Sequence, residues 1–346
     1  MREDIYKEWL HNRKMYKDSL SADQLFERIL KGDQLALSSA ITLIESQADL
    51  DRAEASKLVS LCTPFSGKSI RIGITGVPGV GKSTFIEAIG CQLIDSGKRV
   101  AVLSIDPSSE KTHGSILGDK TRMEQLASLN NAFIRPTASG STLGGVARHT
   151  RETILVCEAA GYDVILIETV GVGQSETMVH AMVDFFLLLM LSGAGDELQG
   201  IKRGIMEMAD AIVITKSDGE NLTKAKEARQ IYQRALHYFP STSSAWIPEV
   251  LNYSYQDVVS IQSIISLIEK FQKHQIISGY FEINRQKQAV YWMREALLTL
   301  FDRSLAKLDE IKKIDIENKV FIGELSPFEA ADILYKLILK NTENGK

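Results

Sequence analysis

The sequence has few cysteines and no long apolar run, and each shortage excludes a class of protein. Its three cysteines, Cys62, Cys91 and Cys157, are an odd number without regular spacing. They indicate reduced thiols in a cytoplasmic protein rather than a disulfide framework. The longest apolar run, Phe185–Leu191, has seven residues, whereas a membrane-spanning helix needs about 20. The first 14 residues contain no apolar run, so we expect no secretory signal and no membrane insertion.

Blocks of like charge are also missing. The chain of 346 residues carries 40 Lys and Arg against 44 Asp and Glu, a net charge of −4 at pH 7. This balance argues against a nucleic-acid partner, because proteins of that class neutralise phosphates with clustered positive charge. Apolar residues make up 44% of the chain, which is enough for one medium-sized core with helical additions.

The middle of the chain alternates short apolar runs with helical segments. Runs that are apolar on both faces and separated by helices are typical of a mostly parallel sheet covered by helices on each side. We therefore predict an α/β fold with a mostly parallel, seven-stranded sheet. The seven runs are Ile70–Thr75, Val100–Ile105, Ala132–Arg135, Val164–Ile167, Phe185–Leu191, Ala211–Ile214 and Trp246–Leu251.

Apolar residues at helical spacing precede this region. The pattern from Ser21 onward predicts helices, with a break at Gly32-Asp33. We therefore expect residues 1–62 to form an N-terminal helical extension and residues 63–275 to form the α/β domain.

A second helical region follows, and we assign it residues 276–346. Its apolar stripes exceed what the packing of one helical pair would hide, so we expect it to join two copies of the chain in a homodimer. Its last helix begins with a capping signature. Ser326 can cap the helix, Pro327 suits its first turn, and Glu329 can bond back to the cap residue.

The segment GVPGVGKST at 76–84 fits the pattern G-x-x-x-x-G-K-[ST]. It lies between an apolar run and an amphipathic segment, which is the strand–loop–helix context that a phosphate-binding P-loop requires. Its glycines let backbone N–H groups surround phosphate oxygens, and the helix N-terminus favours an anion. We expect Lys82 to reach the terminal phosphates and the Ser83 hydroxyl to bind Mg²⁺. The predicted nucleotide-binding residues here are Gly76, Val77, Pro78, Gly79, Val80, Gly81, Lys82, Ser83 and Thr84.

A second signal is a buried strand that ends in a carboxylate, within the segment DVILIETVG at 163–171. In P-loop hydrolases a carboxylate at this place lies near the metal ion, and the glycine that follows can sense the γ-phosphate through its N–H. We therefore predict that Glu168 lies beside Mg²⁺ and that Gly171 lies beside the γ-phosphate, both as catalytic residues together with Lys82.

A third strand ends in TKSD at 215–218, a variant of the N-K-x-D guanine motif in which Thr215 replaces Asn. A carboxylate can accept two parallel hydrogen bonds from the guanine N1–H and N2 amine, a donor pair that adenine lacks. Lys216 and Asp218 are therefore predicted to bind the base and to favour GTP over ATP. The loop after the last strand is a further candidate for contact with the base, and its residues are Tyr253, Ser254 and Tyr255.

Two more loops are expected at the same edge of the sheet. Asp106 closes the second strand, level with the P-loop, so it is a candidate for a second metal-shell carboxylate or for positioning the attacking water. The loop Ser192–Lys202 contains three glycines, which permit large backbone changes, so we expect a switch. Its charged residues Asp196, Glu197 and Lys202 could pair differently in the GTP and GDP states.

Seven segments together carry a resemblance to a known family. They are GVPGVGKST, LSIDPSS, GSILGDKTRM, TLGGVARHT, ETVGVGQSE, SGAGDELQGIKRGI and TKSDG, in this order. With them the chain resembles the MeaB/ArgK family, to which the methylmalonic aciduria type A protein belongs. The resemblance runs from about Gly32 to the end of the α/β region, and several of these strings are far more specific than a bare P-loop.

The resemblance implies a P-loop GTPase of the SIMIBI class with a C-terminal dimerisation arm, which hydrolyses GTP to GDP with Mg²⁺. It also implies a chaperone for an adenosylcobalamin-dependent acyl-CoA mutase, typically methylmalonyl-CoA mutase, that gates cofactor loading and protects the mutase. Carried over, Ser83, Asp106 and Glu168 hold the metal or the attacking water. Asp119 lies in a switch loop, and Lys202 lies in another.

Two other functions remain open from the sequence. Metal-chaperone GTPases share this fold, but they carry Cys or His clusters for the cargo metal, and no Cys-x-x-Cys or His run occurs here. An ATPase or kinase coupled to arginine or ornithine transport is the other alternative. Because the sequence predicts no transmembrane helix, such a protein would serve a transporter only indirectly.

Overall fold

The computed structural model of the chain describes residues 20–46, 48–105, 123–137, 143–169, 175–192, 203–239 and 244–344. The chain divides into two compact units, one ending at Gln288 and the other beginning at Ala289, and this division falls within a single helix. The domain boundaries at 62/63 and 275/276 that we expect from the sequence remain predictions.

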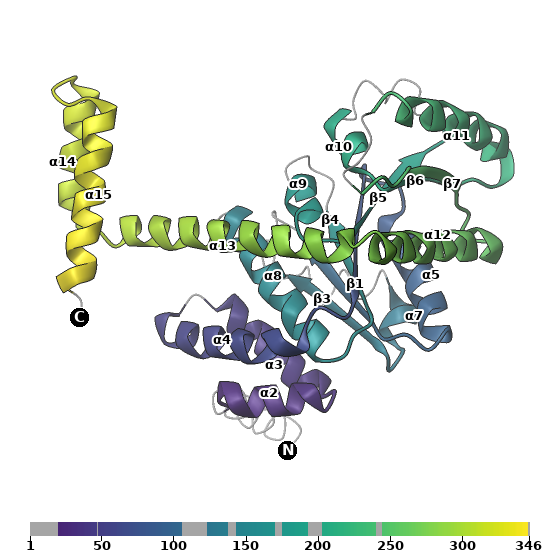
Figure 1. Cartoon of the computed structure of the whole chain (residues 1–346), viewed down its shortest axis with the longest axis horizontal. Coiled ribbons are helices and arrows are strands. Elements are labelled where there is room, and N and C mark those ends of the chain that lie inside the picture. Colours follow the sequence, from purple (N-terminus) through teal and green to yellow (C-terminus); the bar gives the residue numbers. More distant parts are fainter. Residues whose placement is uncertain are drawn as a thin grey trace, which may run out of the picture. The chain divides into compact units, whose positions relative to one another are not determined.

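Seven strands of the first unit form one sheet in the order β3-β2-β4-β1-β5-β6-β7, and every pairing is parallel (Figure 1). The predicted seven-stranded parallel sheet is therefore confirmed. Because β1 lies between β4 and β5, strands are added on both sides of it, and ligands of such sheets bind outside the carboxyl ends at this point. The strands are β1 (Ile70–Gly76), β2 (Val100–Ile105), β3 (Ala132–Thr137), β4 (Val164–Thr169), β5 (Phe185–Leu191), β6 (Ala211–Thr215) and β7 (Glu249–Asn252).

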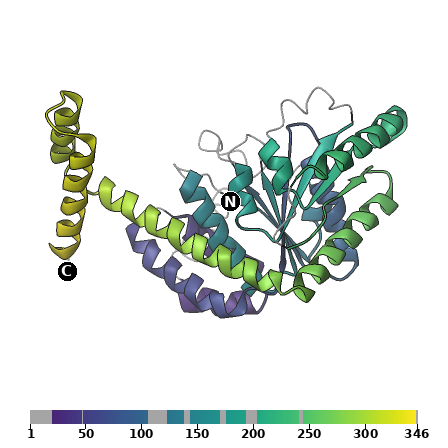
Figure 2. The same ribbon diagram turned by 45° about the horizontal axis from the view of Figure 1, so that its top comes forward.

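Helices cover both faces of this sheet (Figure 2). On one face, α5 (Lys82–Asp95) and α12 (Val258–Ile277) share an apolar cluster with the strands. On the other face, α10 (Arg203–Met208) and α11 (Leu222–Leu236) pack against β5 and β6. Strand β5 contributes alternate side chains to both clusters, which is why its sequence is an unbroken apolar run. Three further helices flank the sheet: α7 (Glu124–Ala127), α8 (Leu143–Ala159) and α9 (Ser175–His180).

The helices before the sheet form a small bundle of their own. They are α2 (Ala22–Leu30), α3 (Gln34–Glu45) and α4 (Asp49–Cys62), which pack on one another and on α8, and a short 3₁₀ turn, Thr63–Phe65, leads into β1. Gly32 has a φ of +79° between α2 and α3, a conformation that glycine adopts without strain. Asp33 then caps α3 by accepting hydrogen bonds from the N–H groups of Leu35 and Ala36. The predicted break at Gly32-Asp33 is confirmed.

The last strand begins later than the sequence predicts. It starts at Glu249, whereas the apolar run starts at Trp246. Pro248 has no N–H to donate to a strand ladder, and Ala245 has a φ of +56°. The Trp246 indole N–H donates to the carbonyl of Asp210 at 2.9 Å. The predicted start of this strand is therefore wrong, because the backbone at 246–248 cannot continue the ladder and Trp246 serves as a core residue.

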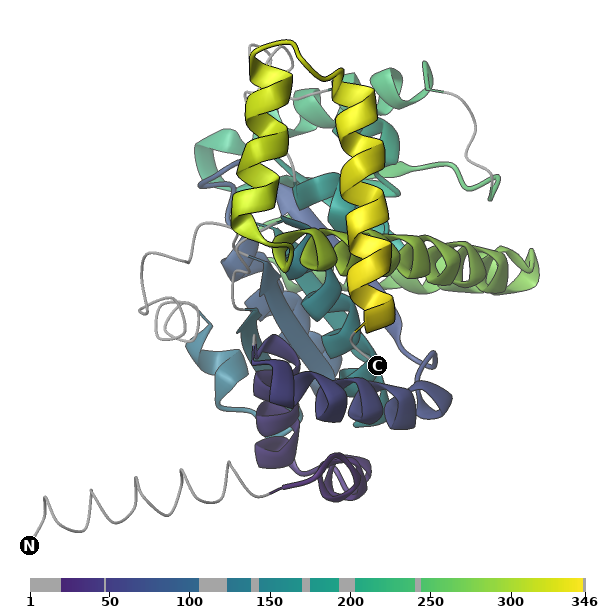
Figure 3. The same cartoon turned by 90° about the vertical axis from the view of Figure 1, so that its left-hand side faces the viewer.

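The chain after the sheet is helical. Helix α13 (Tyr280–Ala306) contains the boundary between the two units, and α14 (Glu310–Phe321) and α15 (Pro327–Asn344) lie side by side in the second unit (Figure 3). At the start of α15, Ser326 Oγ accepts from the Glu329 N–H at 3.1 Å, and the Glu329 carboxylate accepts from the Ser326 N–H at 3.2 Å. The predicted capping signature is confirmed. Throughout the described ranges, no helix is both long and apolar enough to cross a membrane.

Candidate nucleotide-binding site

The P-loop connects the carboxyl end of β1 to the first turn of α5. A Cβ on Gly76 would lie 2.6 Å from the carbonyl oxygen of Leu189, so only glycine fits where β1 passes β5. Gly79 and Gly81 have positive φ values of 79° and 95°, which glycine adopts readily. Among the described residues, no side chain caps the N-terminus of α5. The N–H groups of its first turn, Lys82 to Thr84, are therefore available to an anion such as phosphate.

Lys82 lies over this loop. Its Nζ donates to the carbonyls of Gly76 at 2.8 Å and Val77 at 3.3 Å, and the residue is buried. Burial lowers the pKa of Lys82, whereas the charges of Glu168 and Glu176 act in the opposite direction. The ammonium group is thus held at the loop and neighbours two carboxylates. The sequence reasoning gave no role to Glu176, although it belongs to the string ETVGVGQSE.

Two oxygen groups predicted to bind the metal lie together at this edge. The Ser83 hydroxyl donates to Glu168 Oε1 at 3.3 Å. Strand register explains the approach, because Glu168 on β4 lies opposite Ile74 of β1 on one side and Ser104 of β2 on the other. Mg²⁺ prefers oxygen ligands and is often bound by one or two protein groups beside substrate phosphates. The hydroxyl and the carboxylate therefore fit a Mg²⁺ ion.

The predicted base-binding residues lie at the carboxyl end of β6. Ser254 donates through Oγ to Asp218 Oδ2 at 2.7 Å. The Ser217 N–H donates to the carbonyl of Tyr253 at 3.0 Å, and the Tyr253 N–H donates to the carbonyl of Ile214 at 2.8 Å. The loop after β7 is thus fixed to the loop after β6, and one carboxylate oxygen of Asp218 is oriented by a neighbouring hydroxyl.

The other members of these two loops have different surroundings. Lys216 is exposed and has a φ of +53°, an uncommon conformation for a residue other than glycine. Tyr253 is buried and packs edge-to-face on Phe85 of α5, with ring centroids 5.0 Å apart. Tyr255 is half exposed. The side chain of Tyr253 therefore belongs to the core, and only its backbone faces the loop after β6.

Thr215 has a structural role that the sequence does not reveal. Its buried hydroxyl lies 2.8 Å from the carbonyl oxygen of Val80 in the P-loop and 3.2 Å from that of Met190 in β5. It can donate its single hydrogen to one of them at a time. Thr215 thus connects the end of β6 to the P-loop. No sequence signal marks this contact, because its partner Val80 lies 135 positions earlier.

Several predicted site residues cannot be placed. Asp106, Asp119, Gly171, Asp196, Glu197 and Lys202 lie outside the described residues. Their roles stay predictions.

A buried network of ion pairs lies at the opposite, amino edge of the sheet. Glu158 of α8 accepts from the Arg71 guanidinium at 2.9 and 2.8 Å and from Arg285 of α13 at 3.2 Å. Arg285 also binds both carboxylate oxygens of Asp184, at 2.5 and 2.6 Å. Sequence reasoning missed this network, since its members are far apart in the chain and no local motif connects them.

The chain is similar to known proteins over most of its length. A family model described as "Methylmalonyl Co-A mutase-associated GTPase MeaB" matches residues 37–308. The GTPase ArgK of Escherichia coli is 48% identical over 268 residues, which is 78% of this chain and 81% of ArgK. The mitochondrial methylmalonic aciduria type A homolog of Mus musculus is 43% identical over 334 residues, 92% of this chain and 80% of that protein. A crystal structure described as an LAO/AO transport system kinase superimposes with a TM-score of 0.72 at 37% identity and covers 92% of this chain and 97% of its own.

Proposed function

The chain belongs to the MeaB family of methylmalonyl-CoA mutase-associated GTPases, and from that premise we propose that it is a Mg²⁺-dependent chaperone of an adenosylcobalamin-dependent acyl-CoA mutase. Family membership confirms the resemblance drawn from the seven sequence segments. The fold is that of a P-loop GTPase, and relatives such as ArgK are named GTPases. The observation that carries the Mg²⁺-dependent hydrolysis is the approach of Ser83 to Glu168 beside Lys82, because these are the groups that hydrolysis of a metal-bound nucleotide requires. The chaperone role is supported by the family description, which names the mutase.

The proposed hydrolysis uses groups that the fold already orients. The uncapped N–H groups at the start of α5 bind phosphate oxygens, and the Lys82 ammonium stabilises the negative charge that develops on the transferring phosphoryl group. Ser83 and Glu168 would hold Mg²⁺, which supplies neutralising charge when it is bound. The carboxylate of Asp218 binds the guanine edge. Together these groups explain how the chain would position GTP for attack by water.

Replacement of Asp218 by asparagine is expected to weaken GDP binding by about 1.5–3 kcal/mol, because a charged acceptor of two hydrogen bonds is lost. ADP binding should change little. Calorimetric titration with GDP and ADP measures both. Glu220→Gln makes the same carboxylate-to-amide change at an exposed position of the following turn, and it should leave both affinities unaltered. Equal affinity of the unmodified protein for GDP and ADP would contradict the guanine assignment.

The chaperone proposal is tested with the methylmalonyl-CoA mutase of the same cell. Its cofactor-free form is incubated with adenosylcobalamin and this protein in the presence of GTP, of GDP or of a non-hydrolysable GTP analogue. We expect the extent of cofactor loading to depend on the nucleotide, and the mutase to change the rate of GTP hydrolysis. The same loading and the same rate under all conditions would refute the chaperone role but not the GTPase activity.

We also propose that the second unit joins two copies of the chain about a two-fold axis. It exposes many large apolar side chains, and patches of this kind mark interaction sites. They include Val290, Met293, Leu297, Leu298, Leu300, Phe301, Ile311, Phe321, Ile322 and Phe328.

The dimer proposal predicts that Leu297→Glu, which introduces a charge on a 64% exposed leucine, gives a monomer. Light scattering at micromolar concentration should report a dimer for the unmodified protein. Lys312→Glu changes an exposed charge on α14 and should leave the dimer intact. A monomeric unmodified protein, or a dimer that survives Leu297→Glu unchanged, would count against this interface.

We further propose a cytoplasmic location. All three cysteines are free thiols, and Cys62 and Cys157 are buried. Burial raises the pKa of Cys62 to about 11, so this thiol is unreactive. Such cysteines are typical of a reducing compartment.

A further inference from the structure

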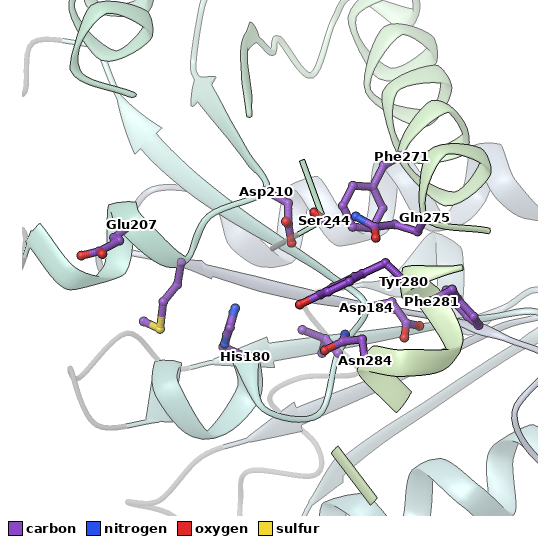
Figure 4. A pocket seen from close by; sticks show the side chains of 12 residues that line it. His180, Asp184, Glu207, Asp210, Ser244, Phe271, Gln275, Tyr280, Phe281 and Asn284 are labelled. Atoms are coloured by element: carbon purple, nitrogen blue, oxygen red, sulfur yellow. The ribbon is translucent and has the colours of Figure 1, made fainter. Parts of the chain in front are cut away.

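A cavity of about 260 Å³ lies at the amino ends of β5 and β6 (Figure 4). Asp184 and Asp210 immediately precede these strands, and both line it. Its wall also contains His180, the last residue of α9, and Met208, the last residue of α10. The P-loop lies at the other, carboxyl edge of the same sheet, so this cavity is separate from the nucleotide site.

One buried polar atom in the wall lacks a partner. Gln275 of α12 is only 3% exposed, and its Oε1 receives no hydrogen bond from the described residues. Figure 4 shows its amide end turned toward the side of the cavity where Ser244 and Asp210 lie. A buried amide oxygen without a donor is strongly unfavourable. The atom therefore indicates an occupant that supplies an N–H or O–H group.

The charges around the cavity indicate the sign of that occupant. Asp184 is neutralised by Arg285, which binds both of its oxygens. Asp210 accepts one hydrogen bond, from the Phe186 N–H at 2.8 Å, and within the described part of the chain neither it nor Glu207 has an ion pair. Asp210 and Glu207 are thus two carboxyl groups of the cavity wall that no arginine of the described residues pairs with. This excess favours a cation and disfavours an anion.

Two further observations narrow the class of cation. Among the described residues, no group of three or more His, Cys, Asp or Glu side chains could hold a metal ion. The side chain of Phe271 and that of Val183 supply apolar wall, which suits a short hydrocarbon chain. The cavity volume of about 260 Å³ lies just below the range for ligand pockets, which begins at about 300 Å³, so the ligand should be small.

We propose that this cavity binds a small organic cation, namely a primary ammonium group on a short alkyl chain. The ammonium group donates to Gln275 Oε1 and to the carboxylate of Asp210, with Glu207 adding negative charge at the rim. The alkyl chain contacts Phe271 and Val183. This site goes beyond the GTPase activity, because no residue named here belongs to the nucleotide site.

The acidity of Asp210 supports this assignment and adds a pH dependence. Burial raises the pKa of Asp210 to about 7, and the charge of Asp184 acts in the same direction, whereas the Phe186 N–H opposes them. The carboxyl group gains its negative charge as the pH rises through this value, so cation affinity should rise with pH. His180 can only lose positive charge as the pH rises, so its titration does not oppose the rise in cation affinity. In Figure 4 the phenol oxygen of Tyr280 points toward Asp210, whereas the Glu207 carboxylate points away from it, and Asp184 is paired with Arg285.

The test uses the full chain with GDP bound and n-butylammonium as the probe, observed by saturation-transfer NMR. We expect saturable binding with a dissociation constant of about 1 mM, as suits so small a ligand. Tetramethylammonium has the charge but no N–H, and n-butanol has a donor but no charge. Both should bind at least about tenfold more weakly, since a charged hydrogen bond is worth that factor. Butyrate should not bind.

Variants locate the binding. Asp210→Asn and Gln275→Leu should each weaken butylammonium binding by about tenfold, and Asp210→Asn should also remove the rise in affinity between pH 6 and pH 8. Circular dichroism shows whether each variant folds. If one does not, Glu207→Gln is used instead, because this side chain is exposed and its replacement should not affect folding. Loss of this charge at the rim is expected to weaken binding about twofold. Glu282→Gln removes an exposed carboxylate of α13 outside the cavity wall and should have no effect. Absence of saturable binding, equal binding of butyrate, or unaltered affinity in the folded cavity variants overturns the proposal.

Discussion

Lys82→Ala is expected to reduce the rate of GTP hydrolysis by at least about 10²–10³-fold, the loss typical when one preorganised charge-stabilising donor is removed. The ammonium group of Lys82 is buried and is held over the P-loop by the carbonyls of Gly76 and Val77. Within the described ranges, the charged groups that act on it are the carboxylates of Glu168 and Glu176, so no cation there can replace it. The measurement is phosphate release with saturating GTP and Mg²⁺.

A matched control separates this effect from a general loss of positive charge. Lys98 is exposed and lies just after the same helix, so Lys98→Ala should hydrolyse GTP at the normal rate. Calorimetry with GDP distinguishes lost binding from lost catalysis, since Lys82 is expected to contribute to both. Lys82→Ala should keep its thermal stability, because removal of a buried ammonium group also removes its unfavourable burial. Normal turnover in Lys82→Ala would refute the P-loop assignment.

Glu158→Gln is expected to lower the free energy of unfolding by about 3–5 kcal/mol, the usual loss when one partner of a buried ion pair is removed. The Glu158 side chain is fully buried. It accepts hydrogen bonds from Arg71, Arg285, the Ser69 hydroxyl and the Gly67 N–H. A glutamine amide has one acceptor oxygen and cannot balance two guanidinium charges. Urea unfolding at pH 7 measures the difference.

The pH dependence of stability checks the same pair independently. Burial alone would raise the pKa of Glu158, but the hydrogen bond and charge of Arg71, the charge of Arg285 and the Ser69 hydroxyl hold it at about 2, below its usual 4.5. Because the folded-state pKa is lowered, this stabilisation is present above about pH 4.5 and is lost as the pH falls toward 2. Glu158→Gln should therefore lose less stability than the unmodified protein between pH 5 and pH 3.

Glu152→Gln provides the control for this prediction. Glu152 lies on the same helix and pairs with Arg148 at 2.8 Å, with both side chains partly exposed. An ion pair of this kind contributes at most about 1 kcal/mol. Glu152→Gln should therefore lower the free energy of unfolding only slightly, and it should leave the decrease in stability between pH 5 and pH 3 unchanged. Equal losses of stability in Glu152→Gln and Glu158→Gln would show that the buried network stabilises the fold no more than an exposed ion pair does.

The parts of this protein that the sequence predicts well are those encoded locally. The P-loop is nine consecutive residues, and its strand–loop–helix setting is visible from hydropathy alone. Most of the strands are predictable because a strand buried on both faces, such as Phe185–Leu191, is an unbroken apolar run. The break at Gly32-Asp33 and the cap at Ser326 likewise depend on neighbouring residues.

The parts that sequence reasoning missed depend on contacts between distant residues. Glu158, Arg71 and Arg285 carry no signature until the fold brings α8, β1 and α13 together. Gln275 and Asp210 likewise meet at one cavity from different elements. The early start predicted for β7 had another cause. The apolar run from Trp246 predicts a strand, but Pro248 has no N–H to donate to the ladder, and the strand begins only at Glu249.

The hydrogen bond between Thr215 and Val80 couples two motifs that are far apart in the sequence. A residue of the base-recognition motif is bonded to the backbone of the phosphate-binding motif, so we expect a substitution at position 215 to disturb the P-loop as well as the base site. The N-K-x-D motif has asparagine at this position. Its larger amide would have to fit where Thr215 is already only 2% exposed. The residue at position 215 therefore supports the phosphate-binding loop as well as the loop after β6.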